Sequence, residues 1–219
     1  PIPSELEELH LPDIAKLLDI SRSDWDSFEE SIDFSFNPLV EKYDSTENLE
    51  AVYDMVRGQW RHETQEMSRV EASNNRIAIS AYSLQNELTP EVPIEEVTLI
   101  CNPAFRYGIK GTEKEREERL KADTIAEFIS YAVGCMFGRY SLDESGLILA
   151  NQGEGFVGYL TRIPEPTFMP DDDNVIPMID LDGDWFEDDI SERFKQFLRI
   201  TFGDEHYAKN LAFIENALG

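Results

Sequence analysis

The chain has 219 residues, which is long enough to bury a sizeable core, with roughly 70% of the unfolded surface removed on folding. Its 19 Lys and Arg residues against 45 Asp and Glu residues give a net charge of −26, which excludes a protein whose whole surface attracts DNA phosphates. Its two cysteines do not make a disulfide scaffold, and no apolar run reaches the ~20 residues of a membrane span, so we expect a cytoplasmic protein without a membrane partner.

The longest predicted element is a helix over Glu47–Leu84. Its apolar residues recur at intervals of three and four, which places them on one helix face. They are Tyr53, Val56, Trp60, Met67, Val70, Ile77, Ala81 and Leu84. A helix of this length has the dimension of a spacer or scaffold, and Gly58 within it is a candidate for a bend.

Three further elements are predicted between residues 94 and 150. A short strand is expected at Val97–Ile100, where β-branched and apolar residues lead into Asn102-Pro103. Thr112–Glu115 has the capping-box pattern and starts a helix that runs into the most apolar part of the chain. A second short strand is expected at Leu147–Ala150.

The central stretch, Phe128–Asp143, reads F-I-S-Y-A-V-G-C-M-F-G-R-Y-S-L-D and is the least polar long run of the sequence. Apolar residues at helical spacing predict that it forms a buried central helix. Gly134 and Gly138, four residues apart, are predicted to share one helix face and to let another backbone approach closely.

Residues 151–188 are rich in glycine, proline and acidic residues and are predicted to be an ordered loop, followed by two C-terminal helices. The fold class is therefore mainly α: a helical bundle or spacer with one long helix, a central buried helix and a few short strands. We expect one module over 1–219, with possible sub-units at 1–93 and 94–219. Because the sequence begins Pro1-Ile2-Pro3 without a methionine, we expect a fragment or a processed product.

Asn102-Pro103-Ala104-Phe105 is close to the Asn-Pro-Pro-Tyr/Phe motif of adenine methyltransferases. In that motif the asparagine and a backbone carbonyl hold the target amine, and the aromatic ring stacks on the flipped base. Ala104 replaces the second proline, and no acidic-x-Phe-x-Gly-x-Gly turn precedes the motif. We therefore predict a structural turn and no catalytic residue.

Two other patterns have the form of ligand sites. Gly153–Gly158 fits Gly-x-Gly-x-x-Gly, but the prolines that follow leave little room for the helix that a dinucleotide site requires. Asp180–Asp184 alternates carboxylates, but its glycine and its final residue do not fit a calcium-binding loop. The three histidines have no partner at metal-ligand spacing, so we predict neither a cofactor site nor a metal site.

The basic residues nearest to one another are Lys110, Lys114, Arg116, Arg119 and Lys121. They are weak candidates for contacts with DNA phosphates. Acidic residues interleave with them, so a solvated helix face with ion pairs one turn apart is the favoured interpretation.

Several segments resemble the PglX family, the large adenine-specific DNA methyltransferases of bacteriophage exclusion (BREX) systems. Two neighbouring ones are Y-A-V-G-C-M-F-G-R-Y-S-L-D at Tyr131–Asp143 and G-L-I-L-A-N-Q-G-E at Gly146–Glu154. The others are D-W-D-S-F-E at Asp24–Glu29, L-Q-N-E-L-T-P-E-V-P at Leu84–Pro93, C-N-P-A-F-R-Y at Cys101–Tyr107, D-N-V-I-P at Asp173–Pro177 and G-D-W-F at Gly183–Phe186. The resemblance implies that the parent enzyme transfers methyl groups from S-adenosylmethionine to adenine in DNA.

From these observations we predict a non-catalytic helical module that braces the catalytic and target-recognition parts of such an enzyme. The chain alone would be inactive and would meet DNA only through the full-length parent, with other defence-system proteins as further partners. One alternative is an acidic module that docks basic partner proteins or mimics DNA. Another is a part of the DNA-recognition surface itself.

Overall fold

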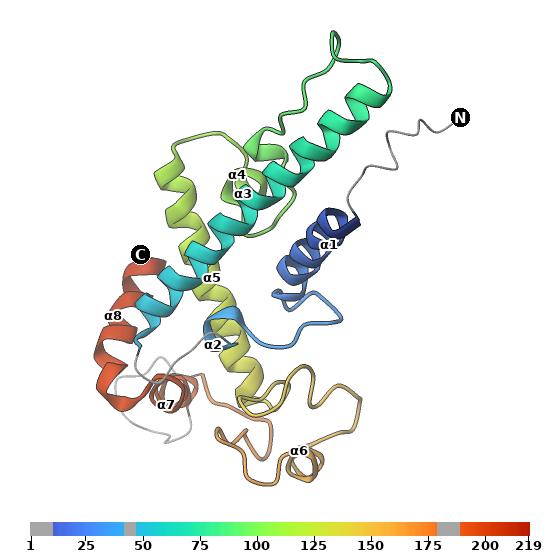
Figure 1. Cartoon of the computed structure of the whole chain (residues 1–219). Coiled ribbons are helices and arrows are strands. Elements are labelled where there is room, and N and C mark those ends of the chain that lie inside the picture. The colour runs from blue at the N-terminus through green and yellow to red at the C-terminus, as the bar shows by residue number, and fades with distance from the viewer. Residues whose placement is uncertain (1–10, 42–46, 179–188) are drawn as a thin grey trace. The chain divides into compact units, whose positions relative to one another are not determined.

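The computed structural model describes residues 11–41, 47–178 and 189–219 (Figure 1). Every regular element in these ranges is helical, which confirms the mainly α fold. The α-helices are α1 (Leu11–Asp26), α2 (Pro38–Glu41), α3 (Leu49–Ala81), α4 (Pro103–Tyr107), α5 (Glu113–Met136), α6 (Phe156–Arg162), α7 (Ile190–Phe202) and α8 (Tyr207–Leu218). Two short 3-10 helices, η2 (Ile94–Glu96) and η3 (Asp204–His206), complete the set. None of the described helices is long and apolar enough to cross a membrane.

Both predicted strands are wrong. Val97, Leu99 and Cys101 are fully buried at alternate positions, which is the burial pattern of a strand, but their backbone forms a tight turn instead. The Leu99 amide donates to Val97 O at 2.9 Å, which closes this turn. At 147–150, the amides of Ile148 and Leu149 donate to the loop just after α5, and no strand ladder forms.

The chain divides into two compact units. Unit 1 contains Pro1–Asp26 and Arg57–Leu120, and unit 2 contains Ser27–Val56 and Lys121–Gly219. Neither unit is a continuous stretch of sequence, because α3 and α5 each contribute residues to both. The single module over 1–219, with sub-units 1–93 and 94–219, stays a prediction.

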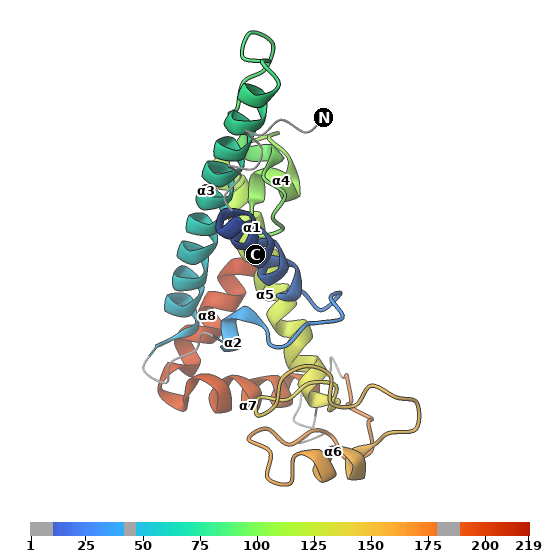
Figure 2. The same cartoon turned by 45° about the vertical axis from the view of Figure 1, so that its right-hand side comes forward.

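Unit 1 is built on the long helix predicted from the apolar stripe, which the structure places at α3. Trp60, Met67 and Val70 of this stripe are buried. The chain then turns back beside α3 as an irregular segment, as both views of the molecule show (Figures 1 and 2). Side chains of α3 hold this segment: Ser68 Oγ donates to a backbone carbonyl at 3.5 Å and Asn75 Nδ2 to another at 3.3 Å.

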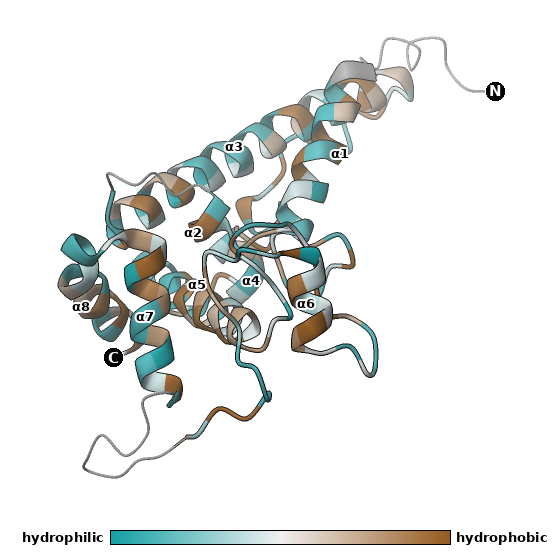
Figure 3. Cartoon of the chain, turned by 90° about the horizontal axis from the view of Figure 1, so that it is seen from below, coloured by the Kyte–Doolittle hydropathy of each residue, from teal (hydrophilic) through white to brown (hydrophobic). Residues whose placement is uncertain are grey.

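The core of unit 2 surrounds the predicted central helix, which lies in α5. Phe128 is fully buried there, and its ring centroid lies 6.3, 5.9 and 5.8 Å from those of Phe194, Phe197 and Phe202 on α7. Figure 3 shows apolar and polar residues interleaved along α7 and α8, as expected for helices with one buried face. Asn210 on α8 accepts a hydrogen bond from the Leu49 amide at 2.8 Å and so caps the start of α3.

Helix α5 begins and ends at signals that the sequence carries. The predicted capping box is confirmed: Glu115 accepts from the Thr112 amide at 2.7 Å, and Thr112 Oγ1 accepts from the Glu115 amide at 3.2 Å. The helix ends at Met136, and Gly138 follows with φ of +69°, a conformation that favours glycine. The predicted shared face of Gly134 and Gly138 is therefore wrong, because only Gly134 is helical.

The ring of Tyr140 fills the space beside Gly134. It stacks on Tyr131 with centroids 5.2 Å apart and meets Phe34 edge-on at 5.2 Å. Tyr131 also donates its hydroxyl to Ser141 O at 2.8 Å, so the chain after α5 folds back onto the helix. The close contact at Gly134 is thus with an aromatic ring and not with a second helix.

Candidate functional site

Three arginines of unit 1 line a pocket of about 340 Å³. We call it the arginine pocket and define it by five charged residues, Arg57, Arg61, Glu113, Arg116 and Glu117. Its apolar wall consists of Ile94, Pro103 and Ala104, and Thr64, Gln65 and Asn102 complete the lining. All of these residues lie in unit 1.

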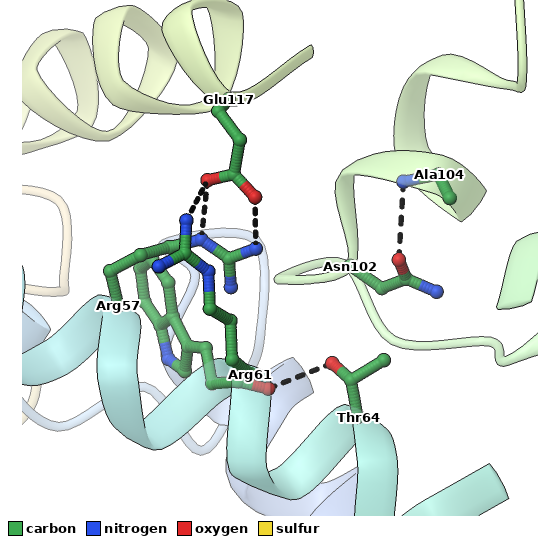
Figure 4. A network of polar contacts seen from close by, with 7 residues as sticks. Arg57, Arg61, Thr64, Asn102, Ala104 and Glu117 are labelled. Atoms are coloured by element: carbon green, nitrogen blue, oxygen red, sulfur yellow. Dashed lines mark hydrogen bonds and ion pairs between the residues drawn. The ribbon is translucent and has the colours of Figure 1, made fainter. Parts of the chain in front are cut away.

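Helix geometry sets the charged part of the pocket. Arg57 and Arg61 lie one turn apart on α3, so both reach the same side of that helix. Glu117 on α5 accepts from Arg57 Nε at 2.8 Å and from Arg57 Nη2 at 2.7 Å, and it pairs with Arg61 Nη2 at 3.1 Å. Figure 4 shows the single carboxylate facing both guanidinium groups.

The two arginines shift the ionisation of this carboxylate. The hydrogen bond from Arg57 lowers the pKa of Glu117 below its ordinary value of 4.5, and burial opposes this effect. Glu117 is therefore a charged partner at neutral pH, as the bidentate geometry requires.

The two arginines differ in exposure. The side chain of Arg57 is 7% exposed, whereas that of Arg61 is 55% exposed. Arg57 Nη1 lies on the side of the guanidinium away from Glu117, and this buried atom has no hydrogen-bond partner. The site thus holds a buried cation that is only partly satisfied, beside a second cation that solvent and ligands can reach.

Asn102, from the motif that resembles the methyltransferase sequence, forms part of the pocket wall. It is 2% exposed and caps α4, because its Oδ1 accepts from the Ala104 amide at 3.1 Å (Figure 4). Its Nδ2 donates to Ile94 O at 2.7 Å and to Val97 O at 2.9 Å. Both amide hydrogens and the amide oxygen are therefore used within the chain.

A carboxylate on α1 holds the segment before Asn102. Asp24 accepts from the Ile100 amide at 2.6 Å and from the Cys101 amide at 2.9 Å. The side chain of Cys101 is buried, and this burial is the main cause that raises the pKa of its thiol. A buried thiol of this kind stays protonated, so it contributes packing and no nucleophile.

The five predicted DNA-contact residues have separate surroundings. Lys114 pairs with Glu118 at 3.6 Å, the Arg119 guanidinium lies 4.4 Å from the Tyr107 ring centroid, and Lys121 Nζ lies 5.8 Å from the Phe213 ring centroid. Lys110 is exposed in the loop between α4 and α5. Arg116 lines the arginine pocket and donates to Ile109 O and Gly111 O. Contact of this group with DNA stays a prediction.

The other ligand-like patterns are placed as follows. Gly153–Gly158 overlaps the start of α6, so a helix of seven residues does form at this motif, contrary to what the following prolines predicted. Residues 147–150 before the motif are irregular. Glu154 closes this loop by accepting from the Ala150 and Asn151 amides, each at 3.0 Å. Asp180–Asp184 and His10 lie outside the described residues, and His62 is exposed on α3.

One group of carboxylates in the described part of the chain is close enough to be considered for a metal ion. The oxygens of Asp171, Asp172 and Asp173 lie within 4.8 Å of one another. The Val175 amide donates to Asp171 at 3.0 Å and to Asp173 at 2.8 Å. These bonds are those of a tight turn, and they account for the arrangement without an ion.

The arginine pocket was not predicted from the sequence. Arg116 was named as one of the basic candidates, but Arg57 and Arg61 were not, because the long helix was interpreted through its apolar stripe. Their spacing of four residues was a visible signal. Their partner Glu117 lies 60 residues from Arg57 in the sequence, and no local pattern connects the two.

Comparison with known proteins gives two related sequences. The chain is 37% identical over 211 residues to the adenine-specific methyltransferase BrxX of Escherichia coli O9:H4 (strain HS), covering 95% of the chain and 17% of that protein. It is 35% identical over 227 residues to the adenine-specific methyltransferase PglX of Lacticaseibacillus casei (strain Zhang), covering 98% of the chain and 16% of that protein. No family model matches. The chain spans about a sixth of the length of these curated relatives.

Proposed function

Starting from the homology of this chain to one segment of the BrxX and PglX adenine-specific methyltransferases, we propose that it is a non-catalytic helical module of a PglX-like enzyme. The module braces the catalytic part and the target-recognition part of that enzyme. The parent uses S-adenosylmethionine to methylate adenine in DNA during phage defence. This chain alone binds neither the methyl donor nor DNA at physiological salt.

The observation that carries this proposal is the environment of Asn102. A catalytic asparagine of this motif must offer its amide to the target base. The amide of Asn102 is instead saturated by Ala104 N, Ile94 O and Val97 O, and the side chain is buried. Its backbone carbonyl also accepts from the Arg106 amide at 2.9 Å. These bonds support a structural role for Asn102, which fixes the segment between η2 and α4.

The segment Gly153–Gly158 supports the same proposal. A dinucleotide or methyl-donor site of the Gly-x-Gly-x-x-Gly type needs a strand before the glycines and a helix whose N-terminus meets the ligand. Here an irregular segment precedes the glycines, and Glu154 occupies the amides of Ala150 and Asn151. This loop is therefore closed by its own side chain.

The test has two arms. In the first, the purified chain is titrated with S-adenosylmethionine by calorimetry, and its DNA binding is measured by gel shift at several salt concentrations. We expect no binding in either assay. Micromolar binding of the methyl donor would refute the non-catalytic role. Salt-sensitive DNA binding would favour a recognition surface, with the basic residues of Lys110–Lys121 the first to replace. Tight binding to a basic partner protein would favour the acidic docking module.

In the second arm, the full-length enzyme that contains this segment carries Asn102→Ala. We expect it to retain methylation wherever it stays folded, because the substitution affects stability and not chemistry. A well-folded Asn102→Ala enzyme without activity would show that the asparagine acts on the base.

A further inference from the structure

We propose that the arginine pocket binds the phosphate group of a ligand, with Arg61 and Arg116 as the direct contacts and Arg57 as the buried charge behind them. This inference goes beyond the bracing role and does not depend on it. It starts from the charges that line the pocket.

The pocket carries an excess of positive charge in a strongly acidic chain. Its three arginines, Arg57, Arg61 and Arg116, face two glutamates, Glu113 and Glu117, which leaves a formal charge of +1 (three minus two). The whole chain carries −26. A chain with this net charge repels anions over most of its surface. A local site with net positive charge is therefore unexpected from the composition, which suggests that the site binds an anion.

The hydrogen bonds inside the pocket leave donors unused. Glu117 occupies two nitrogens of Arg57 and one nitrogen of Arg61. Arg57 Nη1 is buried without a partner, and Arg61 is more than half exposed. Arg116 uses Nη1 for two backbone carbonyls, at 3.4 and 3.2 Å, and these contacts anchor it at the rim of the pocket.

The size and lining of the pocket fit a small anionic molecule. Its volume of about 340 Å³ is at the lower end of the range of about 300–1,000 Å³ that is usual for ligand pockets. Ile94, Pro103 and Ala104 give it an apolar wall opposite the guanidinium groups. Asn102 and Asp24 fix the backbone of that wall, so this side of the site is preformed.

Guanidinium chemistry selects the ligand class. A planar guanidinium binds a phosphate through two parallel hydrogen bonds, which an ammonium cannot do. Glu117 makes this two-bond contact with Arg57 and a single contact with Arg61. An incoming phosphate would therefore exchange with the Glu117 carboxylate on Arg61, while the bidentate bond between Arg57 and Glu117 keeps the buried charge in place.

Calorimetric titration of the full chain tests the proposal with inorganic phosphate, adenosine 5′-monophosphate, adenosine and a short single-stranded oligonucleotide, all at constant ionic strength. We expect inorganic phosphate and adenosine 5′-monophosphate to bind, and we expect no binding of adenosine or, at physiological salt, of the oligonucleotide. Stronger binding of the monophosphate than of the oligonucleotide assigns a free nucleotide or phosphate as the source. Stronger binding of the oligonucleotide assigns the nucleic-acid backbone as the source, and it would contradict the expectation that the chain alone binds no DNA. Either order supports the phosphate site.

The variants give the assay its specificity. Arg61→Gln should weaken phosphate binding by ~10-fold or more, because it removes a charge-assisted contact from an exposed position. Arg76→Gln is the matched control, since Arg76 is exposed on the same helix outside the pocket, and it should leave the affinity unchanged. Glu117→Gln should strengthen binding, because it removes the competing carboxylate. Glu117→Gln also removes the charged partner of a buried arginine, so circular dichroism is used to check that this variant is folded. If Glu117→Gln is unfolded, the test depends on the affinity of Arg61→Gln alone.

Two results would overturn the proposal. One is the absence of phosphate binding at millimolar concentration in a folded chain. The other is an equal loss of affinity in Arg61→Gln and Arg76→Gln, which would mean that binding is nonspecific.

Discussion

Replacement of Gly134 by alanine tests the packing around the end of α5. A Cβ at this position would lie 2.4 Å from Cδ2 and 2.8 Å from Cε2 of Tyr140, whereas ordinary contacts lie at 3.4–4 Å. The ring must therefore move by about 1 Å. Tyr140 is 1% exposed and packs on Tyr131 and Phe34, so its ring has little room to move.

Two opposing effects set the magnitude. Alanine is favoured over glycine inside a helix by roughly 1 kcal/mol. Overpacking of a dense core costs about 1–3 kcal/mol. Because the ring is restrained, the overpacking cost of Gly134→Ala should lie in the upper part of that range. After the gain from helix propensity is subtracted, we expect a net loss of about 1–2 kcal/mol in the free energy of unfolding. Gly134→Leu adds three further carbons at the same point and should cost more.

Gly58 provides the matched control. It lies inside α3, and a Cβ there would meet nothing within 4 Å. Gly58→Ala should therefore raise the free energy of unfolding by about 0.5–1 kcal/mol through helix propensity alone. The two substitutions are chemically identical but should have effects of opposite sign.

Urea unfolding followed by far-ultraviolet circular dichroism measures both variants. A double-mutant cycle adds Tyr140→Val, and Gly134→Ala should cost less in that background because the ring has been removed. If Gly134→Ala stabilises the chain as much as Gly58→Ala does, the contact with Tyr140 is not as described and the reasoning fails.

Three other predictions follow from burial and hydrogen bonding. Burial raises the pKa values of the Cys101 and Cys135 thiols, so a thiol reagent should modify the native chain slowly and the unfolded chain rapidly; fast reaction of the native chain would contradict this. Arg57 lowers the pKa of Glu117 in the folded chain. The charged form of Glu117 therefore stabilises the fold fully above its ordinary pKa of 4.5, and this stabilisation is lost as the pH falls through the lowered pKa of the folded state. The difference in unfolding free energy between the native chain and Glu117→Gln should therefore shrink on acidification, and a constant difference would argue against the ion pair. Asn102→Ala should reduce the free energy of unfolding by about 2–4 kcal/mol, since it leaves buried backbone groups unpaired, and a loss below about 1 kcal/mol in urea unfolding would contradict the saturated amide.

The helices of this chain could be predicted because their signals are local. The capping box at Thr112–Glu115 and the apolar stripe from Tyr53 onwards each depend on residues a few positions apart. The structure places helices there, as α5 and α3. The C-terminal helices α7 and α8 likewise follow their apolar spacing.

The strand at 97–100 could not be distinguished from a turn by the same means. Alternating burial of Val97, Leu99 and Cys101 gives the pattern of a strand. The turn depends on Asp24, which lies 77 residues from Cys101 in the sequence and binds its backbone amide. Periodicity reports which side chains are buried, but it does not report what satisfies the backbone.

Two of the motifs that carry the resemblance to PglX are connected to each other in unit 1. Asp24, from D-W-D-S-F-E, holds the amide of Cys101, the first residue of C-N-P-A-F-R-Y. The side-chain amide of Asn102, the next residue, forms hydrogen bonds with Ile94, Val97 and Ala104. These polar residues are thus satisfied by the fold itself, and such groups are expected to serve architecture. The arginine pocket differs, because Arg57 keeps a buried nitrogen unpaired beside the accessible Arg61. Glu117 already pairs the charge of the buried Arg57 through two hydrogen bonds. The half-exposed Arg61, which shares that carboxylate through a single contact, is therefore the guanidinium that an added phosphate would reach first.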